Sequence, residues 1–166
     1  MTVEEIKRLL GLVPLEPEGG FFAETYRSTD VFAAGSAGAG RRDERSLSTA
    51  IYYLLDGGSF SALHRLRADE LFHFYLGDPV EMLHLHPDGT GRLHVLGPDL
   101  GAGMRPQVVV PRGVWQGTRL LAGGRFALLG TTVAPGFDSA DFETGRRDEL
   151  ISAYPAFRER IVALTR

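Results

Sequence analysis

The chain of 166 residues contains no cysteine. It therefore forms no disulfide bond and offers neither a thiolate ligand for a metal nor a cysteine nucleophile, and nothing in its residue usage indicates secretion. No apolar run approaches the roughly 20 residues that a membrane-spanning helix needs. The acidic start MTVEEIKRLL also lacks the basic and apolar regions of a signal peptide. We expect a cytoplasmic protein with no membrane partner.

An excess of positive charge is missing as well. Lysine and arginine number 18 against 21 aspartates and glutamates, which gives a net charge of −3 and an isoelectric point of about 5.9. A surface that binds nucleic acid needs clustered positive charge, so we expect no nucleic-acid partner. With 43% apolar and 23% charged residues, the composition is typical of one globular domain over residues 1–166.

The apolar pattern predicts an all-β fold with short helices at its ends. Residues 1–12 predict a helix because Thr2 and Glu5 fit a capping box and apolar residues then recur at helical spacing. Residues 145–166 are helical in propensity. Helices do not alternate regularly with strands, which argues against an α/β fold.

Residues 17–135 predict an antiparallel β-barrel. A strand at 19–28 is followed by eight short apolar segments, which are separated by turns rich in Gly, Pro and Asp. The segment 33–45 combines several glycines with small and charged residues, so we interpret it as a loop or a hairpin tip.

Two motifs inside the predicted barrel resemble those of the cupin superfamily. The first has the spacing Gly58, His64, Leu66, Glu70, Gly77, with leucine where a second histidine is usual. The second is PRGVWQ at 111–116, with Gln116 where a histidine is usual.

More narrowly, the chain resembles the DUF985 (Cupin_5) family of cupins. The resemblance rests on four phrases in order: PEGGFFAETYRS at 17–28, SALHRLRADELFHFYLGDPVE at 61–81, PQVVVPRGVWQG at 106–117 and TTVAPGFDSADFE at 131–143. It implies a cupin double-stranded β-helix, or jelly-roll barrel, that forms a homodimer. It implies no established activity.

A more distant similarity is to dTDP-4-dehydrorhamnose 3,5-epimerase, a metal-free cupin. The phrase GGFFAE at 19–24 is similar to the Arg-Gly-x-Phe-x-Glu of that family, with Gly19 in place of the arginine. The family's catalytic histidine falls on His64 and its lysine on Glu70. Without the arginine a bidentate partner for phosphate is lost, so the substrate need not be a nucleotide sugar.

Two kinds of site remain open at these positions. A divalent metal would have His64, Glu70 and Gln116 as ligands, which are fewer strong donors than iron or zinc usually has. We therefore expect no resident cofactor, with a weakly bound divalent metal as the alternative. The remaining histidines are expected to be structural and half-buried or exposed: His73, His84, His86 and His94.

In the metal-free alternative, His64 is a general base and Glu70 orients its imidazole and supports the charged form. Tyr26 and Tyr75 are candidate proton donors. The expected ligand is a small polar metabolite of carbohydrate type, and isomerase or epimerase chemistry and non-catalytic binding both fit. The expected ligand-binding residues are Phe22, Glu24, Tyr26, Phe72, Tyr75 and Gln116. Asp138 and Asp141 follow the last predicted strand, and we interpret them as local caps.

Overall fold

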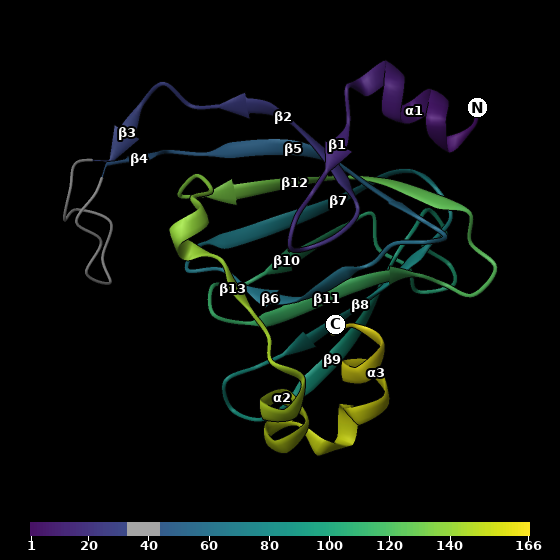
Figure 1. The fold of residues 1–166 in the computed structure, drawn as a ribbon, viewed down its shortest axis with the longest axis vertical. Coiled ribbons are helices and arrows are strands. Elements are labelled where there is room, and N and C mark those ends of the chain that lie inside the picture. The colour runs from purple at the N-terminus through teal and green to yellow at the C-terminus, as the bar shows by residue number, and fades with distance from the viewer. Residues whose placement is uncertain (33–43) are drawn as a thin grey trace.

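The computed structural model describes residues 1–32 and 44–166 and consists mainly of two facing antiparallel sheets (Figure 1). The predicted loop at 33–45 lies, for residues 33–43, outside the described residues. The larger sheet has the order β1-β2-β5-β12-β7-β10. Its strands are β1 (Val13–Pro14), β2 (Phe21–Arg27), β5 (Thr49–Asp56), β7 (Asp69–Gly77), β10 (Gln107–Val110) and β12 (Phe126–Ala134).

The second sheet has the order β13-β6-β11-β8-β9. Its strands are β6 (Ser61–Arg65), β8 (Val80–Leu85), β9 (Gly91–Leu96), β11 (Trp115–Leu120) and β13 (Glu143–Thr144). A two-stranded ribbon of β3 (Val31–Phe32) and β4 (Arg45–Ser46) extends from the end of β2 and β5 (Figure 1). The predicted all-β jelly roll is therefore confirmed.

Alternate residues of the strands fill the space between the two sheets, because successive side chains of a strand point to opposite faces. The central cluster includes Tyr53, Phe72, Met82 and Leu129, each at most 1% exposed. The buried polar side chains of His64, Glu70 and Gln116 lie where the candidate site is.

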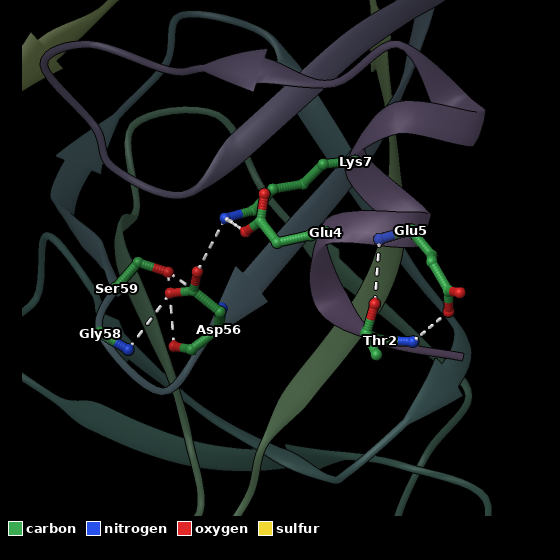
Figure 2. A network of polar contacts seen from close by, with 7 residues as sticks. All are labelled: Thr2, Glu4, Glu5, Lys7, Asp56, Gly58 and Ser59. Carbon is green, nitrogen blue, oxygen red and sulfur yellow. Dashed lines mark hydrogen bonds and ion pairs between the residues drawn. The ribbon is translucent and has the colours of Figure 1, made fainter.

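Helix α1 (Val3–Leu10) covers one end of the outer side of the larger sheet (Figure 1). The predicted capping box is present: the Glu5 amide donates to Thr2 Oγ1, and the Thr2 amide donates to Glu5 Oε2 (Figure 2). Lys7 Nζ lies 3.1 Å from Asp56 Oδ2, which ties the helix to the end of β5. The buried Ile6 completes the attachment by packing with Leu54 and neighbouring apolar residues.

The C-terminal segment covers the outer side of the smaller sheet with α2 (Arg147–Ala153), the 3₁₀ turn η2 (Pro155–Phe157) and α3 (Arg158–Ala163) (Figure 1). An earlier 3₁₀ turn, η1 (Ser139–Asp141), lies between β12 and β13, and its Ser139 lines the candidate site. Leu150 and Ile161 pack against Leu63 of β6. No helix within the described residues is long and apolar enough to cross a membrane.

The β1–β2 loop is held in place by hydrogen bonds to its backbone carbonyl groups from β5, β6 and Arg166. The Ala62 amide donates to Glu18 O at 2.9 Å, and the Tyr53 hydroxyl donates to Gly19 O at 2.9 Å. The C-terminal Arg166 guanidinium donates to the carbonyl groups of Pro17 and Glu18. This loop forms one wall of the candidate site, so its anchoring decides the shape of the site.

Gly19 is required by the path of this loop. Its φ of +107° is a conformation that other L-residues rarely adopt, and a Cβ atom there would collide with Phe60 O and with the Arg166 guanidinium. We expect Gly19→Ala to lower the free energy of unfolding by about 1–3 kcal/mol, the range for one strained backbone position. Urea unfolding of both proteins measures this. Gly113→Ala is the control for positive φ alone, because a Cβ atom there meets nothing within 4 Å. Equal losses of unfolding free energy in the two variants would show that the collision at Gly19 has no effect on stability.

Candidate functional site

A cavity of about 290 Å³ lies between the two sheets at one end of the barrel. Its walls come from the β1–β2 loop, from β2, β5, β6, β7 and β12, and from the segment that follows β12. Three phenylalanines and several aliphatic side chains make most of the lining apolar, while three hydroxyl groups, four glutamates and His64 supply polar atoms. A small, mainly apolar cavity with a few convergent polar groups is the usual form of a metabolite site.

His64 lies on β6 and is 2% exposed. Its Nδ1 is 2.7 Å from Ala62 O, and because a carbonyl oxygen only accepts, Nδ1 must carry the proton of the neutral ring. The lone pair therefore lies on Nε2. The Phe142 ring stacks on the imidazole at a centroid distance of 4.8 Å and fixes the ring plane. His64 thus presents a neutral basic nitrogen in a set orientation.

Gln116 lies between His64 and Glu70. It is paired with His64 across β11 and β6, and its Nε2 lies 2.7 Å from His64 Nε2 and 3.1 Å from Glu70 Oε2. The two amide hydrogens can serve both neighbours at once. The sequence predicts direct support of His64 by Glu70; in the structure the amide of Gln116 joins them instead. Gln116 Oε1 is buried and has no hydrogen-bond partner among the described residues.

Glu70 points inward from β7 and is 7% exposed. Burial raises the pKa of its carboxyl group from 4.5 to about 8, and the negative charge of Glu18 adds to this; hydrogen bonds from Thr131 and Gln116 act in the opposite direction. The raised pKa keeps Glu70 protonated at neutral pH. The site therefore holds a neutral acid and a neutral base on either side of one amide.

Glu18 is the carboxylate next to His64, and the sequence did not predict it. Its Oε2 lies 3.8 Å from His64 Nε2, and its Oε1 accepts a hydrogen bond from Ser61 Oγ at 2.7 Å. No spacing rule connects a loop residue to a strand residue 46 positions later. The available signal was the pair Gly19-Gly20 directly after it, because consecutive glycines allow a loop to turn into the barrel.

The other predicted ligand-binding residues have different locations. Phe22 and Glu24 line the cavity, and Glu24 is bound to Arg27 by two hydrogen bonds. Phe72 lies in the central apolar cluster and does not line the cavity. Tyr26 and Tyr75 are 54% and 51% exposed and lie outside the cavity.

The remaining histidines form no part of the cavity lining. His84 is only 2% exposed, contrary to the expectation of a half-buried or exposed side chain. Its ring lies 4.4 Å from that of His94, and burial lowers the pKa of His84 to about 3, so it stays neutral. Asp138 caps η1 as expected, by accepting from the Ala140 amide at 2.8 Å.

The donors at His64, Glu70 and Gln116 do not suit a firmly held divalent metal. Gln116 meets its neighbours through amide hydrogens, Glu70 is protonated at neutral pH, and Leu66 is an alkyl group where a second histidine would bind. Within residues 1–32 and 44–166, no group of three or more His, Cys, Asp or Glu side chains could hold a metal ion. One neutral nitrogen and weak oxygen donors fall short of an iron or zinc site.

We therefore expect purified protein without an affinity tag to contain far less than one transition metal per chain. His64→Ala should leave the metal content unchanged, because we expect no metal to be bound by the imidazole. Elemental analysis of both proteins measures this. A content near one per chain that is lost in His64→Ala would contradict the expectation and would favour the alternative of a metal-dependent enzyme.

The family model described as Cupin superfamily (DUF985), Cupin_5, matches residues 4–145. The chain belongs to this cupin family. The predicted resemblance is thus confirmed over nearly the whole chain. The uncharacterized protein YML079W of Saccharomyces cerevisiae is 33% identical over 132 residues, which are 75% of this chain and 66% of the yeast protein. The match thus spans slightly less than two thirds of that relative.

Solved structures of similar cupins show the same fold. Protein SO0799 of Shewanella oneidensis superimposes with a TM-score of 0.88 at 34% identity and covers 100% of this chain and 98% of its own. A hypothetical protein from Leishmania major gives a TM-score of 0.88 at 29% identity, with 99% of both chains covered. A mutant form of the oxalate decarboxylase of Bacillus subtilis gives 0.54 at 12% identity over 92% of this chain and 37% of its own, which shows the shared fold alone.

Proposed function

We propose that this DUF985 cupin binds a small polar metabolite in the cavity and moves a proton on it without a metal, as a sugar isomerase or epimerase does. The observation that carries the proposal is the pairing of a neutral base, His64, with a neutral acid, Glu70, on either side of Gln116. Two titratable groups whose environments set opposite proton-transfer roles are the usual sign of acid–base chemistry.

The proposed step begins with a carbonyl compound in the cavity. The Gln116 amide donates to His64 Nε2, so this hydrogen bond must first be released to free the lone pair. His64 Nε2 then takes the proton from the carbon next to the carbonyl group, and the Glu70 carboxyl group gives its proton to the carbonyl oxygen. The C–H electron pair becomes the C=C bond of an enediol, so no oxidant is needed. Return of a proton to either face or to the neighbouring carbon gives the epimer or the isomer. Glu18, 3.8 Å away, stabilises the imidazolium while it is charged.

Solvent-deuterium exchange tests the proposal directly. A panel of small keto sugars is incubated with the protein in D₂O, and proton NMR follows the loss of the signal of the hydrogen next to the carbonyl group. We expect enzyme-dependent exchange for at least one member. Binding of a panel member that shifts cavity resonances without exchange would instead identify a non-catalytic ligand-binding barrel, the alternative for this cavity.

We further propose that the protein is a homodimer, in which two copies meet through the outer side of the larger sheet. The part of that side left uncovered by α1 contains a patch without Lys, Arg, Asp or Glu, here called the outer face and defined by Ala50, Tyr52, Leu71, His73, Tyr75 and Val109. The exposed Asp69 lies at its edge. Tyr75 and Val109 are each 51% exposed. A twofold axis through this face brings the faces of the two copies into contact, and no like charges of these residues then lie opposite each other.

Light scattering after size-exclusion chromatography checks the dimer. We expect twice the chain mass for the protein and one chain mass for Tyr75→Arg, because two arginines would then be buried against each other. Leu93→Arg, at a residue of β9 that is 36% exposed, is the matched control and should remain dimeric. A monomeric parent protein at micromolar concentration would contradict the proposal.

A further inference from the structure

The cavity has ionisable lining groups of almost one sign. Besides His64 they are Glu16, Glu18, Glu24 and Glu70, and no lysine or arginine of residues 1–32 and 44–166 lines the cavity. An anionic ligand would therefore meet several acidic side chains and, within this part of the chain, no lysine or arginine to neutralise it. This sets the site apart from pockets that recognise carboxylates or phosphates, where arginine or lysine supplies the contact.

Two of the four glutamates are neither paired with an arginine or lysine nor held protonated by burial. Glu24 is paired with Arg27 at 2.7 Å, and Glu70 is held protonated by burial. Glu16 and Glu18 lie on the same β1–β2 loop, and among the described residues neither forms an ion pair with lysine or arginine. Glu18 reaches only Ser61 Oγ and, at 3.8 Å, His64 Nε2. Their negative charge therefore faces the cavity without compensation from the protein.

The aromatic lining also points to a ligand with positive charge. Phe22, Phe137 and Phe142 line the cavity, and the faces of aromatic rings attract organic cations. Gln116 is 1% exposed and does not line the cavity; its Nε2 contacts the lining residues His64 and Glu70. The ligand therefore meets carboxylates and aromatic faces, and both suit an ammonium group.

We propose that the natural ligand is a small amine, most simply an amino sugar or another aminated polyol, whose ammonium group lies against Glu16 and Glu18. This inference rests on the proposed function, because it concerns the same cavity, and it adds the chemical class of the ligand. The cavity of about 290 Å³ is close to the lower limit of about 300 Å³ for ligand sites, so the ligand is of monosaccharide size.

A matched series of three hexoses tests the charge preference. Glucosamine, glucose and glucuronate have the same ring and carry a positive, zero and negative charge below the pKa of the amine. Their dissociation constants are measured by isothermal titration calorimetry at low ionic strength, and proton–nitrogen NMR spectra locate the binding in the cavity. We expect glucosamine to bind at least about tenfold more tightly than glucose, and glucuronate to bind most weakly.

Variants assign the preference to the two loop acids. Glu18→Gln keeps an acceptor for Ser61 and removes one negative charge. Glu16→Gln removes the other negative charge of the loop. Each should reduce the preference for glucosamine over glucose several-fold. Glu159→Gln, an exposed residue of α3, makes the same change outside the cavity and should retain the preference.

The outcomes separate this inference from the proposed function. If glucose binds as tightly as glucosamine, or if glucuronate binds best, the amine proposal is overturned while the cavity remains a carbohydrate site. If all three variants show the same preference for glucosamine over glucose, the ammonium group is not held by this loop, and the proposal is also overturned. If none of the three sugars shifts a cavity resonance, the carbohydrate-like ligand of the proposed function fails, and the amine proposal fails with it.

Discussion

Replacing His64 by glutamine is expected to reduce solvent-deuterium exchange at the substrate by about 10²- to 10⁴-fold, the usual contribution of a general base. Glutamine is close to histidine in size and can keep a hydrogen bond to the neighbouring amide, but it has no basic lone pair. Nδ1 of His64 donates to Ala62 O, so the reaction must use Nε2, whose lone pair is freed when the hydrogen bond from the Gln116 amide is released. The rate is measured on the keto sugar that exchanges fastest with the parent protein.

His73→Gln is the matched control, since His73 lies on the outer face and bonds to Thr132 and Gln107. It should exchange at the parent rate. Thermal unfolding of both variants establishes that the fold is intact. Exchange at full rate in a folded His64→Gln protein would remove His64 from the mechanism and leave the binding function alone.

The stability of the protein is expected to fall as the pH rises from about 4.5 to about 8, because Glu70 ionises with difficulty in the folded state. Burial raises its pKa from 4.5 to about 8, so between these values the folded chain binds a proton that the unfolded chain has released. The favourable contribution is complete below the unfolded pKa and is lost as the pH rises through the folded pKa. At 1.36 kcal/mol for each pH unit, the loss from Glu70 is roughly 5 kcal/mol.

Glu70→Gln removes this dependence. Glutamine resembles the protonated carboxyl group in shape and carries no charge at any pH. We expect the variant to show a flatter profile of unfolding free energy against pH and to be at least as stable as the parent at about pH 8, while losing the proton donor and with it most of the exchange activity. Urea unfolding over this pH range measures the profile. A parent and a variant with parallel profiles would show that Glu70 is ionised at its usual pKa.

A stability gain combined with a loss of activity is the result that distinguishes a functional carboxyl group from a structural one. Asp56 provides the contrast, because its pKa is lowered by hydrogen bonds from Ser59, Lys7 and Gly58, and it ties α1 to the sheet (Figure 2). Its removal should destabilise the protein at neutral pH. Buried acids without a cationic partner, such as Glu70, are tolerated by proteins chiefly where a reaction or a ligand needs them.

The structure also changes the grouping of the candidate residues. His64, Glu70 and Gln116 converge as expected, but Glu18 replaces Glu70 as the carboxylate beside the imidazole, and Gln116 becomes the link between base and acid. Tyr26 and Tyr75 take no part in the cavity, and Tyr75 belongs to the outer face. Tyr75 points away from the cavity because strand alternation places residues 70 and 75 on opposite faces of β7.

What the sequence by itself determined is local. The helix at the N-terminus follows from its capping box, the strands follow from short apolar segments between turns, and the family follows from motifs with fixed spacing. The inward positions of His64, Glu70 and Gln116 belong to these motifs. Each of these features depends on residues a few positions apart, for which periodicity and turn chemistry are sufficient.

Only the tertiary structure decided the charge and the proton positions of the site. Glu18 reaches His64 because Gly19 and Gly20 turn the loop inward and because Arg166, at the other end of the chain, binds the loop carbonyl groups. Glu70 is protonated because two sheets close over it and Glu18 lies near. Burial and long-range charge depend on which segments meet in space, and no local pattern of residues encodes that meeting.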